Sequence, residues 1–228
     1  MKILSTLALA KAMQGLVPRY EQRVGTAVTT DFGASNELLQ RIRSGEAADI
    51  AILTADAIDQ LADSGAIVRG SRIDLALSFV GLAVRAGAPK PDIASLAALK
   101  SALLNARSIA YSKVGASGVF FADLIQRLGI AEEINRKARV VPSGFTAQLV
   151  ASGEADIAVQ QISELMMVPG IEVVGRLPAE VHSPTMFSAG VFSGSLHGDA
   201  SARLLQLLSS RESASILRAS GLEPANRD

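Results

Sequence analysis

The segment SGEAADIA at residues 44–51 decides the fold, because it returns as SGEADIA at residues 152–158. In both copies a helical pattern ends at Ser-Gly, and the glycine suits the left-handed position that closes a helix. An acidic turn then leads into an apolar strand. The patterns that flank the two copies also match, so we interpret the copies as the same position in two versions of one α/β lobe.

Strand-like and helix-like patterns alternate on both sides of each copy. Strands are expected at residues 3–6, 27–32, 50–53, 77–85, 108–111, 138–141, 157–160 and 186–192. Helices are expected at residues 9–24, 35–44, 57–64, 118–128, 146–152, 200–208 and 213–220. This alternation predicts crossover units and largely parallel sheets.

The pattern predicts a bilobal α/β fold with two mixed, mostly parallel sheets flanked by helices. The first lobe is discontinuous and comprises residues 1–79 and 186–228, whereas the second comprises residues 80–185. Ligands of open parallel sheets bind beyond the carboxyl ends of the strands. We therefore expect a cleft between the lobes that closes over a ligand.

Composition excludes several classes of protein. Of the 228 residues, 49% are hydrophobic and 19% are charged, which allows a substantial core. Lys and Arg number 22 and so do Asp and Glu, without a basic run, so nucleic acid is not an expected partner. With no Cys, 2 His and no nucleotide-binding motif, neither a metal nor a cofactor is expected.

The first residues, MKILSTLALA at 1–10, resemble a signal peptide. Apolar residues continue at helical spacing as far as Tyr20, however, which predicts a strand and a helix of the mature fold. No apolar run reaches the ~20 residues that span a bilayer, so membrane insertion is not expected. Without a leader in the chain as given we expect a cytoplasmic protein; the alternative is a periplasmic protein whose leader was removed.

Small and hydroxyl residues gather at three expected strand-to-helix junctions: STLA at 5–8, GASN at 33–36 and GASG at 115–118. The first amides of a helix lack partners within it, and the helix dipole favours an anion there. Ser35 or Ser117 alone is equally typical of an ordinary N-cap. Because the three junctions fall on equivalent strand ends, together they predict an anion site. A fourth junction at 142–146 contains Ser143.

Polar residues also follow the second copy of the repeated segment. Gln160 and Gln161 end the apolar strand, and Ser163 and Glu164 come directly after them. Two interpretations stay open: a plain turn capped by Ser163, or side-chain amides that reach a ligand.

Charged and titratable residues elsewhere are fewer. Lys113 and Arg85 are candidate partners for a carboxylate, or else solvated surface residues. His182 and His197 are expected at the surface, because neither has a Ser or a carboxylate at a spacing that indicates a catalytic triad.

Several short stretches resemble the periplasmic molybdate-binding proteins of ABC transporters. The matching stretches are AMQ at 12–14, FGAS at 32–35, QRI at 40–42, Gly45 before AD at 48–49 and, more weakly, ASG at 116–118, LG at 128–129 and GL at 221–222. The resemblance covers most of the chain and implies a class II periplasmic-binding-protein fold. Proteins of that family hold a tetrahedral oxyanion with Ser hydroxyls, backbone amides and a Tyr. If this chain is exported, an ABC transporter permease is the implied partner.

The resemblance also implies roles for individual residues. Ser35 matches a ligand serine, while the family's first ligand serine falls on Ala8, where neighbouring amides and Thr6 remain. Ser117 takes the place of a residue that offers a backbone amide, and so does Ser143.

The family's ligand tyrosine aligns with Gln161, so the chain lacks one Ser and one Tyr hydroxyl of the molybdate site. A Gln pair and the added hydroxyl of Ser117 suit a flatter, extended carboxylate at least as well. The complete predicted binding set is Thr6, Ala8, Ser35, Ser117, Gly118, Ser143, Gln160 and Gln161.

Two functions follow from these observations, and the sequence leaves open whether the protein is an enzyme. The first is a solute-binding protein that closes over a small oxyanion or a di- or tricarboxylate. The alternative is an isomerase of a small polycarboxylate, because a bacterial aconitate isomerase is similar to the molybdate-binding proteins. An isomerase requires a base beside a carboxylate, and Lys113 and Glu164 are the candidates. A ligand-responsive regulator lacks a separate helix-turn-helix segment.

Overall fold

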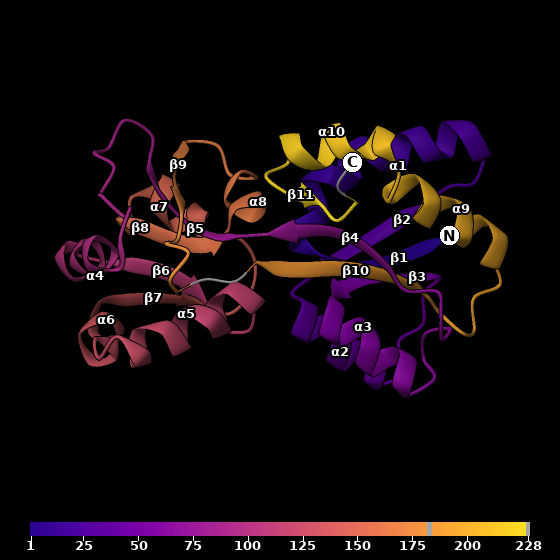
Figure 1. Ribbon diagram of the computed structural model, residues 1–228, viewed down its shortest axis with the longest axis horizontal. Helices are drawn as coiled ribbons and strands as arrows, with labels where there is room; N and C mark the ends of the chain where they lie inside the picture. Colours follow the sequence, from indigo (N-terminus) through magenta and orange to yellow (C-terminus); the bar gives the residue numbers. More distant parts are fainter. Residues whose placement is uncertain (182–183, 227–228) are drawn as a thin grey trace. The chain divides into compact units, whose positions relative to one another are not determined.

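The computed structural model describes residues 1–181 and 184–226 and divides into two compact units, each with one sheet and flanking helices (Figure 1). Unit 1 comprises Met1–Ser78 and Thr185–Asp228, and unit 2 comprises Phe79–Pro184. The predicted α/β fold, with two mixed sheets flanked by helices, is confirmed. His182, which we expected at the surface, lies outside the described residues.

Unit 1 has a six-stranded sheet in the order β11-β4-β10-β3-β1-β2. Its central strand β1 pairs in parallel with β2 and with β3, whereas β10 runs antiparallel to β3 and β4. The elements of unit 1 are β1 (Lys2–Thr6), η1 (Leu7–Leu9), α1 (Ala10–Val24), β2 (Thr29–Gly33), α2 (Ser35–Arg43), β3 (Ile50–Thr54), α3 (Ala55–Asp63), β4 (Ile73–Ser78), β10 (Thr185–Val191), α9 (Gly198–Leu208), α10 (Arg211–Ala219) and β11 (Glu223–Pro224).

Unit 2 has a five-stranded sheet in the order β7-β6-β8-β5-β9. Here β6 pairs in parallel with β7 and β8, and β5 runs antiparallel to β8 and β9. The elements of unit 2 are β5 (Val80–Arg85), α4 (Leu96–Asn105), β6 (Ile109–Ser112), α5 (Ala116–Arg127), α6 (Ala131–Lys137), β7 (Ala138–Val141), α7 (Ala147–Ser152), β8 (Ile157–Gln161), α8 (Ile162–Leu165) and β9 (Ile171–Arg176).

The two sheets share one topology. The order β3-β1-β2 in unit 1 corresponds to β8-β6-β7 in unit 2, and each set is extended by an antiparallel strand beside β3 or β8. The repeated segments precede β3 and β8, and their glycines have the expected positive φ: 99° at Gly45 and 85° at Gly153. This correspondence supports the interpretation of two copies of one lobe.

The aspartate of each repeated segment binds the backbone near the start of a strand. Asp49 Oδ2 accepts a hydrogen bond from the Lys2 amide at 2.7 Å, and Asp156 Oδ2 accepts one from the Arg107 amide at 2.9 Å. Lys2 begins β1, and Arg107 lies just before β6. A carboxylate at this place satisfies a backbone donor where the ladder begins, which accounts for an aspartate in both copies.

Two expectations need correction. Parallel pairs do not predominate among the described strands, because β4, β5 and the returning strand β10 run against their neighbours. The single strand expected at residues 77–85 is two strands in different sheets, separated at Phe79. Apolar residues continue through this break, so periodicity alone does not reveal it. Helices α4 and α6 and strands β9 and β11 were also not expected.

Helices cover both faces of each sheet, and the apolar core is divided accordingly. In unit 1, α1, α9 and α10 lie on one face and α2 and α3 on the other (Figure 1). In unit 2, residues of α4, α5 and α6 form one apolar cluster, and residues of α7 and α8 contribute to another. Central strands are therefore buried on both sides and read as continuous apolar runs, as in β3.

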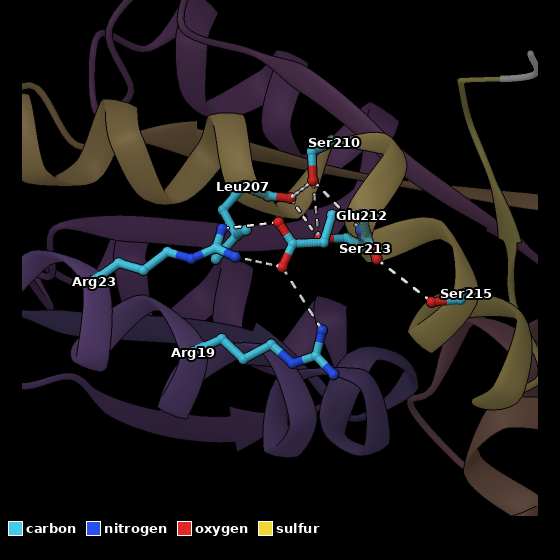
Figure 2. A network of polar contacts seen from close by, with 7 residues as sticks. All are labelled: Arg19, Arg23, Leu207, Ser210, Glu212, Ser213 and Ser215. Carbon is cyan, nitrogen blue, oxygen red and sulfur yellow. Dashed lines mark hydrogen bonds and ion pairs between the residues drawn. The ribbon is translucent and has the colours of Figure 1, made fainter.

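A polar network joins α1 to α10 on the surface of unit 1 (Figure 2). The Arg23 guanidinium donates to both carboxylate oxygens of Glu212, at 2.6 and 2.8 Å, and Arg19 Nη1 lies 3.7 Å from the same carboxylate. Ser210 caps α10 by accepting a hydrogen bond from the Ser213 amide at 3.3 Å. The side chains of Arg23 and Glu212 are 56% and 40% exposed, so water screens the attraction between them.

Candidate functional site

In unit 1, the structure brings the predicted residues to one edge of the sheet. Thr6, the last residue of β1, pairs with Gly33, the last residue of β2. The two junctions that follow these strands therefore lie side by side. They carry Thr6 and Ala8 in one case and Ser35 in the other.

Ser35 is the first residue of α2, and Ala34 is its N-cap, without a side-chain cap bond. The alternative of an ordinary N-cap is therefore wrong for Ser35. Its side chain is buried, with 3% of the residue exposed, and its hydroxyl has no hydrogen-bond partner among the described residues. A buried hydroxyl in this state costs about 1–3 kcal/mol, which a bound acceptor would recover.

Thr6 and Ala8 offer weaker donors. Thr6 is the N-cap of η1, and its Oγ1 accepts a hydrogen bond from the Ala8 amide at 3.5 Å. That distance exceeds the usual range for such bonds, so the Ala8 amide is held loosely. Both residues are buried.

The predicted residues of unit 2 also meet at one edge, where β6, β7 and β8 end. Ser112 at the end of β6 pairs with Val141 at the end of β7, and Ala110 pairs with Ala158 in β8. Three segments begin beyond these strand ends: residues 113–118, residues 142–146 and residues 162–165. Ser143, in the second segment, is exposed.

The first of these segments forms a tight start to α5. Gly115 is the N-cap, and its amide donates to Ser112 Oγ at 3.1 Å. Ser117 is the second residue of the helix and is buried, so the N-cap alternative is wrong here too. A Cβ on Gly118 would lie 1.8 Å from the Ser112 carbonyl oxygen. Gly118 is thus required for helix packing on β6, and α5 has no acidic residue in its first turn.

Gln160 is buried, and its side chain bonds within unit 2. Its Oε1 accepts hydrogen bonds from the Thr146 amide at 2.9 Å and from Thr146 Oγ1 at 3.0 Å. Its Nε2 donates to the Gly144 carbonyl at 2.9 Å, and the same side chain hydrogen-bonds the Glu164 carboxylate. Gln160 therefore ties the loop before α7 to β8.

Gln161 and the short helix α8 follow directly. Gln161 is buried and is the N-cap of α8, so the alternative of a turn capped by Ser163 is wrong. The Glu164 carboxylate reaches back to the Gln161 amide, as the third helical residue of a capping box does. Burial raises the pKa of Glu164 to about 8, although the hydrogen bonds from Gln160 and the Gln161 amide act in the opposite direction.

Lys113 lies at the same edge of unit 2 but follows β6 rather than β8. It is exposed and lines a cavity of about 480 Å³. The cavity is also lined by Tyr111, Gly118, Ala122, Val140 and Pro142. Lys113 thus offers a cation at the edge where Ser117 and Gln161 lie.

Arg85 lies elsewhere, as an exposed residue at the far end of β5. Because β5 is antiparallel to β8, with Val80 opposite Gln161, the end of β5 is at the opposite edge of the sheet. Arg85 lines a larger cavity of about 840 Å³, in which Lys90 and Arg107 form ion pairs of 2.9 and 2.7 Å. The surface alternative for Arg85 holds, and this larger cavity lies at the opposite edge of the unit 2 sheet from Ser117 and Gln161.

Sequence reasoning missed Arg176, the last residue of β9. It pairs with Gly81, which in turn pairs with Gln160, and its guanidinium lies 3.7 Å from the ring centroid of Phe79. No pattern in the sequence indicates this placement, because β9 itself was not expected. Two further buried hydroxyls, of Ser78 and Ser163, also have no partner among the described residues.

The remaining predictions concern histidine, metal and membrane. The His197 side chain is half exposed, and its Nδ1 lies 3.0 Å from Asp49 Oδ1. Within the described ranges, His, Asp and Glu residues form no cluster of three or more that could bind a metal ion. Over the same ranges, helices are too short or too polar to cross a bilayer.

Comparisons with known proteins agree with this architecture. The chain is 36% identical to an aconitate isomerase from Pseudomonas sp., over 97% of this chain and 87% of that protein. Its fold resembles the periplasmic molybdate-binding protein of Azotobacter vinelandii, with a TM-score of 0.82, 18% identity and 97% and 98% of the two chains covered.

It also resembles the sulfate-binding protein of Mycobacterium tuberculosis H37Rv, with a TM-score of 0.79, 15% identity and 99% and 87% of the chains covered. At these identities the two structures show the fold alone. The model of a protein family described as bacterial extracellular solute-binding protein matches residues 1–223. The chain therefore belongs to the family of bacterial extracellular solute-binding proteins.

Proposed function

We propose that this solute-binding protein binds a small di- or tricarboxylate through the donor groups at the strand-to-helix junctions described above. The observation that carries the proposal is the buried hydroxyl of Ser35 at the first residue of α2, which has no partner among the described residues. A carboxylate oxygen there would accept from this hydroxyl and would lie at the positive end of the helix dipole. In unit 2, the corresponding donors are at the start of α5, with Ser117.

The choice of a carboxylate over a tetrahedral oxyanion rests on the donors that the chain offers. Ala8 and Gln161 stand where hydroxyls of the molybdate-binding proteins are expected, so two such donors are absent. Lys113 and Arg176 add cations at the edge of unit 2, which suit the separated charges of a polycarboxylate. The similarity to an aconitate isomerase, whose named substrate is a tricarboxylate, supports the same ligand class.

Binding can be tested with a thermal-shift panel of molybdate, sulfate, phosphate, citrate, cis-aconitate and trans-aconitate. We expect the tricarboxylates to stabilise the protein more than the tetrahedral anions do. Ser35→Ala and Ser117→Ala should each weaken binding of the same ligand by about 1–2 kcal/mol. Ser215→Ala, which changes an exposed serine of α10, is the matched control. Unchanged affinity in both site variants would refute the binding set.

A second candidate function is isomerisation of that ligand. Two observations favour it: the identity of 36% over 97% of the chain to an aconitate isomerase, and the Glu164 carboxyl with a pKa of about 8. Moving a double bond within such a ligand requires a group that takes a proton from one carbon beside a carboxylate and returns it to another. A carboxyl that titrates near neutral pH is suited to both steps.

Proton NMR of cis- or trans-aconitate incubated with the protein in D₂O tests this second function. Isomerisation should convert one ligand into the other and incorporate deuterium at the reacting carbon. Glu164→Gln should abolish conversion while binding of citrate persists. A ligand that binds and remains unchanged would leave the protein as a binding protein without chemistry.

The family's description as extracellular favours an exported protein. We propose that it passes its ligand to the permease of an ABC transporter, as the resemblance to transporter binding proteins implies. Fractionation of native cells tests the first step, since an exported protein is released with the periplasmic or extracellular fraction. Recovery only with the cytoplasm would refute export and with it the permease.

A further inference from the structure

Gln160 uses all the hydrogen-bonding capacity of its side-chain amide inside unit 2. An amide has two acceptor sites on its oxygen and two N–H donors. Both acceptor sites of Oε1 are used by Thr146, through its amide at 2.9 Å and its hydroxyl at 3.0 Å. The donors are used by the Gly144 carbonyl at 2.9 Å and by the Glu164 carboxylate. A direct contact with a ligand would therefore break one of these bonds.

The partners of Gln160 lie on two segments that carry candidate site residues. Gly144 and Thr146 belong to the loop that carries Ser143 and leads into α7, and Thr146 is fully buried. Glu164 belongs to α8, which follows β8. A carboxylate in place of this amide would face the Gly144 carbonyl without a proton to donate.

We propose that Gln160 is a positioning residue, whose amide fixes the loop at 142–146 and the Glu164 carboxyl relative to β8, and that it does not itself touch the ligand. We call the hydrogen bonds of Gln160 to Gly144, Thr146 and Glu164 the clamp. Its effect on binding rests on the proposed function, whereas its existence does not. The role corrects the sequence-based placement of Gln160 among the ligand contacts.

Helix α8, which carries Glu164, packs against β5 and β9, and both strands carry charged residues. Of the charged residues on β5 and β9, Arg85 and Glu172 are at the far edge of the sheet. Arg176 is at the near edge, over the Phe79 ring. The hydrogen bond from Gln160 favours the ionised form of Glu164, so loss of this bond would raise the pKa of Glu164 further.

The clamp can be tested without any ligand by amide hydrogen exchange in the whole protein. The Thr146 amide donates to Gln160 Oε1, so Gln160→Met, which keeps the side-chain length, should speed its exchange at least tenfold. Thr146→Ser keeps the hydroxyl donor and Thr146→Val removes it. If Gln160→Met folds poorly, the second test is faster exchange of the residue 146 amide in Thr146→Val than in Thr146→Ser. Unchanged exchange at residue 146 in Gln160→Met would overturn the clamp.

Affinity for citrate and cis-aconitate then separates positioning from direct contact. If Gln160 acts through the loop, Gln160→Met and Thr146→Val should each lower affinity about tenfold, Thr146→Ser should retain it, and the double variant should lose no more than either single one. If Gln160 touches the ligand, Thr146→Val will bind normally and the proposal is overturned. Failure of the wild-type protein to bind either probe would refute the proposed function, while the exchange result still decides the clamp.

Discussion

Replacing Glu164 with Gln should change how stability depends on pH. Burial raises the pKa of Glu164 from an ordinary value of 4.5 to about 8. Between these values the folded protein retains a proton that the unfolded chain has lost, so the stabilising proton is fully present below the ordinary pKa. Stability is then lost as pH rises towards the folded pKa, by about 1.4 kcal/mol for each pH unit. Gln has no such proton.

The quantity to measure is the free energy of unfolding of wild type minus that of Glu164→Gln, from urea titrations at pH 5, 6, 7, 8 and 9. We expect this difference to fall by roughly 3–4 kcal/mol between pH 5 and 8 and to level off at higher pH. The subtraction removes other titrating groups common to both proteins. Glu180→Gln, at an exposed position of the same unit, is the matched control.

A flat difference across pH 5–8 would refute the argument from burial. It would mean that the Glu164 carboxyl ionises in the folded protein as it does in the unfolded chain. The capping-box contact to the Gln161 amide and the bond from Gln160 would then outweigh desolvation. Glu164 would also lose its support as the acid and base of the isomerase candidate, since an ordinary carboxyl is almost fully ionised at neutral pH.

Three further predictions concern stability. Ser35→Ala should leave the free energy of unfolding unchanged or slightly higher, because the deleted hydroxyl has no partner; a clear loss in urea unfolding would indicate a hidden bond. Gly118→Ala should lower stability by about 2–3 kcal/mol, because its Cβ would meet the Ser112 carbonyl oxygen at 1.8 Å; thermal unfolding within the error of wild type would contradict this packing. Glu212→Gln should leave the melting temperature close to that of wild type, because water screens its exposed bonds to Arg23; a clear fall of the melting temperature in calorimetry would contradict this.

Much of the fold is predictable because one segment, with a Ser-Gly helix end, an acidic turn and an apolar strand, occurs twice in the chain. The Ser-Gly ends of two helices require a left-handed residue, and Gly45 and Gly153 supply it in both units. Buried strands such as β3 and β8 appear as apolar runs with turn residues on either side. Strand direction is not encoded in this way. The apolar sequence at 77–85 is equally compatible with one long strand and with two strands of different sheets that are separated at Phe79.

The candidate site is predictable where backbone position decides it and unpredictable where side-chain geometry does. Strand-to-helix junctions can be located from periodicity, so Ser35 and Ser117 could be placed at helix starts in advance. Whether a polar residue there faces inward to the protein or outward to a ligand depends on partners distant in sequence. Gln160 shows the difference, because its acceptor is used by Thr146, fourteen positions earlier in the chain. Such a polar residue is better tested through its partners than by its own replacement alone.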